Sequence, residues 1–397
     1  MRILDSLKKW GFAIAQEYGL RAWGILIIQL VIAVIIIEYG TRGLLRVKTK
    51  IDSTLPLCYD YVTVRCRVPQ FNLEFGRSIQ VDALTGLSMA PNYQGEWINT
   101  NSLGFRGSEV NPSPTPGTLR VVVIGASAAF GWYVRDNETI AYYVQQKLTK
   151  ELNQPVEVIN AAVGTITSFQ ELMILETKVL SLKPNLVVIY DGYNDLYYAS
   201  APKWDGTSPS VQYAKEVMRE VNNRQPSSIV NQTIQVAMRN SEFLSTLNLL
   251  YIAWIVKQQA NTPTEFQPNA ITVYQQNLKK IELISKNEDI NLVFVLQPIL
   301  TSDSKILANE EKIVLDRLDE PRKRVVTNYP QLINFFKKSA QENASASFLD
   351  YTNVFQSSSE HLYYDLVHYS PQGNQIIADR LTNDLVEVIK QKQGASK

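Results

Sequence analysis

The chain has 397 residues, of which 45% are hydrophobic and 19% are charged, and its formal net charge at pH 7 is +1. This composition is typical of a folded protein with a large hydrophobic core, and it excludes a disordered chain. The charges are nearly balanced and no long basic run occurs, so we expect no nucleic-acid partner.

The first part of the chain has the pattern of a membrane anchor. Residues 1–21 are amphipathic, which favours a short helix on a membrane surface. Residues 22–37 are uncharged and rich in Ile, Val and Leu, and we interpret them as one transmembrane helix. Such a helix would be roughly 24 Å long, shorter than a hydrocarbon core of ~30 Å, so we expect Trp23 and Tyr39 to anchor its two ends. A buried core helix is the alternative, whereas no small-x-small motif follows that would favour a cleaved signal peptide.

Charge does not decide on which side of the membrane the rest of the chain lies. Basic residues flank residues 22–37 equally on both sides, so the positive-inside rule gives no orientation. The only cysteines, Cys58 and Cys66, are compatible with one disulfide bond in an oxidising compartment or with two buried thiols. The disulfide favours a single-pass protein of the cell membrane whose main domain is extracytoplasmic.

Residues 38–117 are predicted to form a stalk and a small β-rich accessory region. Short β-like runs such as Tyr61–Val64 alternate with turns, and the proline-rich stretch 111–117 marks the end of the region. Residues 118–392 then form the main domain.

Short apolar runs alternate with helical patterns throughout the main domain. This alternation predicts βαβ units, a parallel sheet and therefore an α/β fold. The predicted strands are residues 119–124, 156–159, 186–190, 291–296 and 346–349. The predicted helices are residues 139–152, 169–182 and 371–390, the last capped by Ser370. Residues 196–262 form an aromatic-rich insertion, which we interpret as a helical cap beside the site.

Polar residues follow the predicted strands, where ligands bind in open parallel sheets. Ser127 is a candidate nucleophile, and His368 is its candidate general base, oriented by Asp365. The backbone N–H groups of Ser127 and Gly164 and the side-chain amide of Asn194 are candidate donors for an oxyanion hole.

Each of these residues also has a simpler interpretation by itself. Ser127 could cap a helix, Gly164 and Asn194 could belong to turns, and Asp365 and His368 could be a surface pair. Their order at successive strand ends favours a catalytic site. The other histidine, His361, lies in a loop-like stretch, and we expect it to be solvated.

The same segments resemble the sequence blocks of the SGNH hydrolases, also called the GDSL family, over residues 119–390. The matching segments are Gly125-Ala126-Ser127, Gly164, Gly192-Tyr193-Asn194-Asp195 and Asp365-Leu366-Val367-His368. Many members have aspartate at the position of Ala126, but that aspartate takes no part in the proton relay. Upstream, residues 101–107 resemble the segment that precedes the nucleophile in membrane-anchored members.

The resemblance implies a flavodoxin-like, three-layer parallel sheet and acyl-ester substrates. We therefore expect a membrane-anchored serine esterase that removes acyl groups, such as O-acetyl groups, from polysaccharide or lipid substrates of the cell envelope. An O-acyltransferase that passes the acyl group to a sugar hydroxyl is the alternative, and a non-catalytic scaffold or binding protein on the same fold is a further one. An α/β-hydrolase elbow is disfavoured because position 129 is Ala129 and not glycine. The two histidines and two cysteines do not have the spacing of a metal site, so we expect no metal and no cofactor.

Overall fold

The computed structural model describes residues 25, 28–44, 68–200, 204–211, 214–215, 241, 243–244, 265–302, 304–343 and 345–395. Several sequence-based predictions lie outside the described residues: the segment 1–21, the cysteines Cys58 and Cys66, the run Tyr61–Val64 and most of the insertion 196–262.

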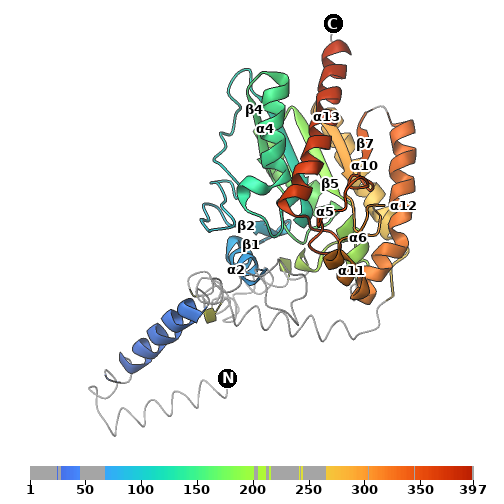
Figure 1. The fold of residues 1–397 in the computed structure, drawn as a ribbon. Coiled ribbons are helices and arrows are strands. Elements are labelled where there is room, and N and C mark those ends of the chain that lie inside the picture. The colour runs from blue at the N-terminus through green and yellow to red at the C-terminus, as the bar shows by residue number, and fades with distance from the viewer. Residues whose placement is uncertain are drawn as a thin grey trace.

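A five-stranded parallel sheet forms the centre of the described part of the chain (Figure 1). Its strands, in spatial order, are β4 (Val156–Asn160), β3 (Leu119–Gly125), β5 (Leu186–Asp191), β6 (Asn291–Leu296) and β7 (Ser347–Asp350). Nearly every residue of the central strands β3, β5 and β6 is buried, which explains their continuous apolar sequences. The strand order is that of flavodoxin-like sheets, and the predicted α/β fold with a parallel sheet is confirmed.

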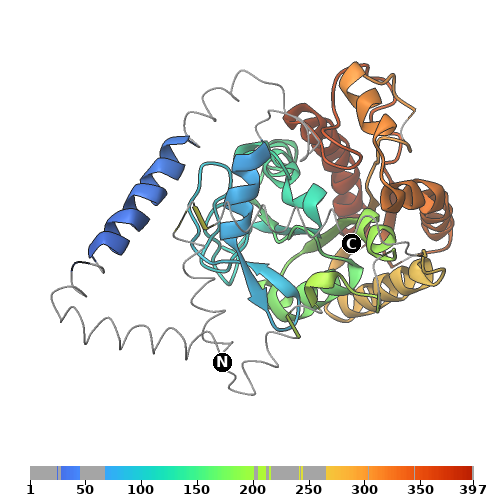
Figure 2. The ribbon, with the colours of Figure 1, turned by 90° about the horizontal axis from the view of Figure 1, so that it is seen from below.

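Helices cover both faces of the sheet (Figures 1 and 2). On one face, α4 (Ile140–Leu152) packs against α13 (Pro371–Ala395), and α5 (Ser168–Ile174) and α10 (Ala270–Asn287) pack together on the other. Other helical segments of the main domain are α3 (Ser127–Phe130), η1 (Asp136–Glu138), η2 (Leu175–Val179), η3 (Leu180–Leu182), α6 (Tyr193–Tyr198), α11 (Asn309–Asp316) and α12 (Glu320–Glu342).

The last helix follows its predicted pattern. Ile377, Leu381 and Leu385 are fully buried on one face of α13. At its beginning, the hydroxyl oxygen of Ser370 accepts a hydrogen bond from the backbone N–H of Gly373 at 3.1 Å, so Ser370 caps the helix as expected.

The accessory region differs from the predicted β-rich piece. Its described part begins with a helix, α2 (Val68–Ser78), followed by a short antiparallel hairpin of β1 (Ile79–Asp82) and β2 (Gly86–Met89). The helix forms because Phe71 and Phe75, four residues apart, lie on one face and are buried against the main domain.

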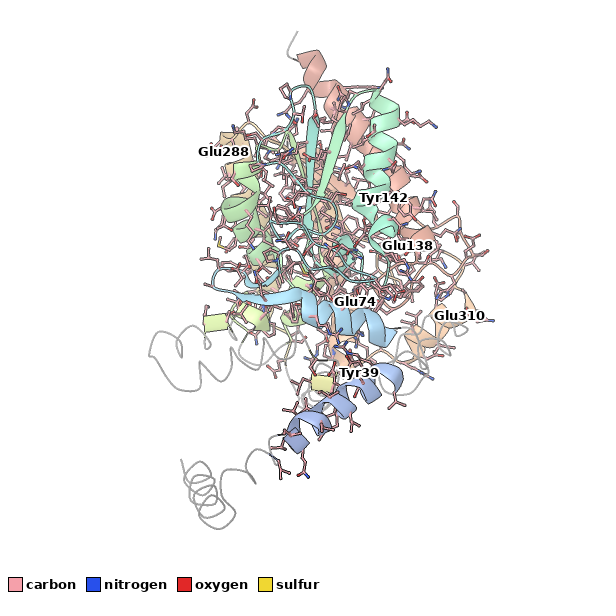
Figure 3. The ribbon with its side chains drawn as sticks, turned by 90° about the vertical axis from the view of Figure 1, so that its left-hand side faces the viewer. Tyr39, Glu74, Glu138, Tyr142, Glu288 and Glu310 are labelled. Carbon is pink, nitrogen blue, oxygen red and sulfur yellow. The ribbon has the colours of Figure 1, made fainter. Side chains whose placement is uncertain are left out.

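A single carboxylate fixes α2 to the loop that follows the hairpin. Glu74 accepts hydrogen bonds from the backbone N–H groups of Glu96, Trp97 and Ile98 at 2.8–3.2 Å. Figure 3 shows Glu74 on α2 and Tyr39 on a separate helix, residues 28–44. Glu74 therefore joins two segments of the accessory region.

The helix of residues 28–44 covers part of the predicted transmembrane segment, and its apolar side chains, such as Val34 and Ile36, are exposed. Among the described residues, none of the helices combines the length and the hydropathy needed to cross a membrane.

Candidate active site

Ser127 is the first residue of the short helix α3, directly after the central strand β3. The turn between them requires glycine at position 125, because a Cβ atom there would collide with the carbonyl oxygen of Tyr190 and with Ala129. Ser127 is thereby placed at the carboxyl end of the sheet, where it is 9% exposed.

The structure brings Ser127, His368 and Asp365 into one hydrogen-bonded chain. The Oγ atom of Ser127 lies 2.7 Å from Nε2 of His368, and Nδ1 of His368 lies 2.6 Å from Oδ2 of Asp365. An ionised carboxylate only accepts hydrogen bonds, so Nδ1 carries the proton and Nε2 is free to accept the serine proton. This is the geometry that a serine nucleophile and its general base require.

The turn 365–368 orients its own carboxylate. The second oxygen of Asp365 accepts hydrogen bonds from the backbone N–H groups of Val367 and His368, both at 2.9 Å. Burial by itself would raise the pKa of Asp365, but the neighbouring His368 and these backbone donors outweigh burial and hold the pKa below its ordinary value. The carboxylate therefore stays ionised near neutral pH and can stabilise an imidazolium.

Two aromatic rings contact the imidazole of His368. The ring of Trp132 is stacked on it, with 5.7 Å between the centroids, and Tyr133 meets it edge-on at 5.5 Å. Both residues belong to the loop that follows α3. The histidine is thus held by a carboxylate at Nδ1 and by aromatic side chains against its ring.

Two of the candidate oxyanion donors are in other segments: Gly164 is in the loop after β4, and Asn194 is the second residue of α6. The side-chain amide of Asn194 donates to the carbonyl oxygen of Ile166 at 2.7 Å, which uses one of its two hydrogens and leaves the other for a ligand. Gly164 lies two residues before Ile166. A Cβ atom at position 164 would lie 2.5 Å from the ring of Trp132 and 2.7 Å from that of Phe75, so only glycine fits under these rings.

Buried carboxyl groups lie beside α6, the helix that carries Asn194. Asp195 accepts hydrogen bonds from the backbone N–H and the hydroxyl of Ser168 at 3.0 and 2.5 Å, and Asp191 accepts one from Tyr274 at 2.7 Å. Burial, together with the charge of Asp191, raises the pKa of Asp195 to about 7. Burial also raises the pKa of Glu171 well above its ordinary value, with the nearby aspartates adding to the effect.

His361 is not placed in the site. It lies in a loop, is partly exposed, and its ring contacts that of Tyr364, with 6.0 Å between the centroids. Within the described ranges, no three His, Cys, Asp or Glu side chains lie close enough together to hold a metal ion.

Sequence reasoning missed the aromatic and buried polar residues around the site. Trp132 and Tyr133 lie five and six residues after Ser127, in the segment Phe130-Gly-Trp-Tyr133. Three aromatic residues among four are an unusual density beside a candidate nucleophile. Phe75 gives no comparable signal, because its contact with Trp132 depends on the folding of a distant helix.

Comparison with known proteins agrees with this architecture. Residues 121–381 match the family described as GDSL-like Lipase/Acylhydrolase. No curated protein matches the chain.

Among solved structures, the chain is similar to an acetyl xylan esterase, AlAXEase, with 15% identity, a TM-score of 0.39 and coverage of 67% of this chain and 99% of that chain. It is also similar to a catalytic mutant of Axe2, an acetylxylan esterase from Geobacillus stearothermophilus, with 16% identity, a TM-score of 0.37 and coverage of 67% and 93%. A lipolytic protein of the G-D-S-L family from Desulfitobacterium hafniense matches with 13% identity, a TM-score of 0.36 and coverage of 66% and 98%.

The family match covers more than half of the chain and includes Ser127 and His368. The expected resemblance is therefore confirmed: this chain belongs to the GDSL-like lipase/acylhydrolase family and is an ester-hydrolysing enzyme.

Proposed function

We propose that this protein is a membrane-anchored serine esterase that removes small acyl groups, such as O-acetyl groups, from glycan or lipid substrates of the cell envelope. The observation that carries the proposal is the continuous chain from Ser127 through His368 to Asp365, with heavy-atom distances of 2.7 and 2.6 Å.

In the first half of the reaction, Oγ of Ser127 attacks the ester carbonyl carbon while Nε2 of His368 takes the hydroxyl proton. The negative charge that develops on the carbonyl oxygen is stabilised by the N–H groups of Ser127 and Gly164 and by the amide of Asn194. The intermediate collapses, the C–O bond to the alcohol breaks, and His368 returns the proton to the leaving oxygen.

In the second half, water attacks the acyl-serine and His368 again takes a proton. The carboxylic acid leaves, and the proton returns to Oγ of Ser127. Asp365 stays ionised throughout, because its role is to orient the imidazole and to stabilise its protonated form.

The preference for a small acyl group is supported by the aromatic cover of the site. The rings of Phe75 and Trp132 occupy the space over Gly164, and their centroids are 4.4 Å apart. A long acyl chain entering along this side would displace these rings, whereas an acetyl group adds only one methyl group.

Membrane anchoring is supported by the exposed apolar side chains of residues 28–37. Val34 and Ile36 are each 64% exposed, and the neighbouring isoleucines are exposed as well. Such a surface is stabilised by an apolar environment such as lipid. The extracytoplasmic location of the main domain is supported by the two cysteines near the anchor.

The same acyl-enzyme makes O-acyl transfer to a sugar hydroxyl the second candidate. A sugar hydroxyl attacks the acyl carbon in the same way as water does, with His368 as the base, so the contacts of Ser127, His368 and Asp365 serve both reactions.

The proposal is tested with the full-length protein in detergent. We expect release of acetate from p-nitrophenyl acetate and from acetylated oligosaccharides, and we expect Ser127→Ala to lose about 10⁶-fold in kcat. Acetate recovered mainly on an added sugar acceptor would favour the transferase. A folded wild-type protein without either activity would contradict both functions.

The extracytoplasmic location of the active site is tested separately, with a fluorophosphonate probe that does not cross membranes. We expect Ser127 to be labelled equally in intact and in opened cells. Labelling in opened cells alone would contradict an extracytoplasmic site.

A further inference from the structure

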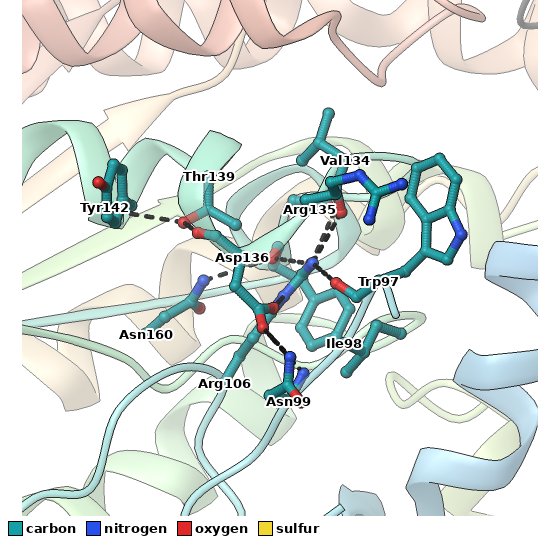
Figure 4. Close-up of polar contacts among 12 residues, drawn as sticks. Trp97, Ile98, Asn99, Arg106, Val134, Arg135, Asp136, Thr139, Tyr142 and Asn160 are labelled. Atoms are coloured by element: carbon teal, nitrogen blue, oxygen red, sulfur yellow. Dashed lines mark hydrogen bonds and ion pairs between the residues drawn. The ribbon is translucent and has the colours of Figure 1, made fainter. Parts of the chain in front are cut away.

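Arg106 is a buried arginine outside the proton relay, and it contacts the loop that carries the rings around His368 (Figure 4). Its Nη1 atom donates to the carbonyl oxygens of Phe130 and Gly131, both at 2.8 Å. Its Nη2 atom donates to the carbonyl oxygens of Val134 at 2.7 Å and Trp97 at 2.8 Å.

The fifth N–H of Arg106 is also used. Its Nε atom lies 2.7 Å from Oδ1 of Asp136, and the other oxygen of Asp136 accepts hydrogen bonds from the backbone and the side chain of Asn99. All five guanidinium donors are therefore satisfied in a fixed geometry, which a lysine with a single ammonium group cannot reproduce.

The accepting carbonyl groups bracket two functional side chains. Gly131 and Val134 lie directly before and after the pair Trp132 and Tyr133, and both of these rings contact His368. Tyr133 has φ of +67°, a left-handed conformation that non-glycine residues adopt at a cost and keep only where the surroundings enforce it. Arg106 holds the loop in this conformation on both sides of Tyr133, through the carbonyl groups of Gly131 and Val134.

Arg106 also connects this loop to the nucleophile and to the second strand end. Phe130 is the last residue of α3, which begins with Ser127, and its ring lies against the guanidinium, with 4.5 Å to the ring centroid. The backbone N–H of Arg106 donates to the carbonyl oxygen of Asn160, the last residue of β4, at 3.1 Å. Arg106 thus joins the accessory region and the nucleophile helix through its side chain and contacts the sheet through its backbone.

We propose that Arg106 is a positioning residue of the active site: by clamping the loop from Phe130 to Val134, it holds the rings of Trp132 and Tyr133 so that the imidazole of His368 stays in line between Ser127 and Asp365. The inference rests on the proposed serine-esterase function. It means that the position of His368 depends on a residue that does not itself bind the substrate.

Arg120 provides a matched control. It is equally buried, its Nε atom lies 2.6 Å from Glu157, and its other nitrogens donate to the carbonyl oxygens of Leu182, Asn111 and Pro112 at 2.6–3.0 Å. It is the second residue of β3, at the opposite end of the strand from Ser127. Replacing it perturbs the fold in the same way but far from the site.

The experiment compares Arg106→Lys with Arg120→Lys in the full-length protein in detergent, with p-nitrophenyl acetate as substrate. We expect both variants to lower Tm, but only Arg106→Lys to lower kcat, by about 10²-fold, since small displacements of catalytic groups cost this much. We expect KM to change less than about threefold, because the guanidinium does not bind substrate. Equal kcat values for the two variants would overturn the proposal.

An NMR measurement reports on the hydrogen bonding of His368 independently of catalytic activity. With ¹⁵N-labelled histidine, the chain gives signals from His368 and His361 only. We expect the downfield proton on Nδ1 of His368 to shift or broaden in Arg106→Lys and to stay unchanged in Arg120→Lys, with His361 as the internal reference. An unchanged His368 signal in Arg106→Lys would refute the positioning role.

If Arg106→Lys does not fold, Asp136→Asn gives the same test in a milder form, because it weakens a single contact of the guanidinium. We expect an intermediate loss of kcat and a smaller change in the His368 signal, and wild-type values of both would overturn the proposal.

A folded wild-type protein that hydrolyses no ester would instead contradict the proposed function, while the histidine signals would still report on Arg106.

Discussion

The imidazole of His368 stacks on the indole of Trp132, with 5.7 Å between their centroids and 23° between their planes. Trp132 is itself packed against Phe71 and Phe75 of α2, at 5.1 and 4.4 Å. The candidate general base is therefore oriented by a carboxylate on one side and, through Trp132, by the accessory region on the other. The accessory region is thus part of the active-site structure.

The acyl-chain preference depends on Phe75. Because its ring lies over Gly164, we expect Phe75→Leu to accept longer acyl chains. The ratio of kcat/KM for p-nitrophenyl hexanoate to that for the acetate is predicted to rise about tenfold, the order expected for space that admits extra methylene groups. Phe348→Leu is the control and should leave the ratio unchanged, because Phe348 is as buried as Phe75 but lies in the edge strand β7. A ratio equal in the two variants would show that Phe75 does not limit the acyl group.

The carboxylate of Asp365 is predicted to determine the tautomer of His368. In Asp365→Asn, the amide can no longer serve as an ionised acceptor for the Nδ1 proton, and we expect kcat to fall about 10⁴-fold. Steady-state kinetics together with Tm measure the effect, and Asp350→Asn, on the edge strand β7, is a control away from the relay. Wild-type kcat in Asp365→Asn would remove this residue from the relay.

Asn194 is predicted to stabilise the transition state more strongly than the bound substrate. We expect Asn194→Ala to lower kcat by about 10²–10³-fold, the usual effect of removing one oxyanion donor. The change in KM should be small, because the interaction forms mainly with the developing charge. A loss expressed only in KM would assign Asn194 to substrate binding instead.

The buried carboxyl groups behind α6 predict a stability that depends on pH. The pKa of Asp195 is raised to about 7 and that of Glu171 is raised as well, so the folded protein keeps protons that the unfolded chain releases above about pH 4. These two groups therefore contribute most to the free energy of unfolding near pH 4, and their contribution falls as the pH rises from about 4 through about 7.

Urea titrations at several pH values measure this dependence. Glu171→Gln replaces one of the buried acids with a neutral amide, and we expect a shallower fall of the free energy of unfolding between pH 5 and pH 8. The exposed Glu151→Gln is the control and should keep the wild-type slope. A wild-type stability that is constant or rises over this window would contradict the raised pKa values.

Much of the sheet could be predicted from the sequence, because buried parallel strands have continuous apolar runs with turn residues at their ends. The fourth strand, β6 (Asn291–Leu296), occupies the predicted residues, and β3 and β5 extend the predicted runs by a single residue. Because ligands bind at the carboxyl ends of parallel strands, the positions of these ends then indicate which polar residues belong to the site.

Other elements have no comparable signal. Helix α12 includes Pro330, a residue that ordinarily ends a helix, so its 23 residues were not recognised from their pattern. Helix α2 depends on tertiary packing of Phe71 and Phe75, and the clamp formed by Arg106 depends on contacts between segments far apart in the chain. Such contacts are products of the fold and cannot be read from local periodicity.

The central claim is that Ser127 is a nucleophile activated by His368. It is tested most directly by treating the folded full-length protein with a fluorophosphonate and locating the adduct by mass spectrometry. We predict one stoichiometric adduct on Ser127 that is lost in Ser127→Ala and forms far more slowly in His368→Ala. An adduct on another residue, or labelling of Ser127 at the same rate without His368, would contradict the account.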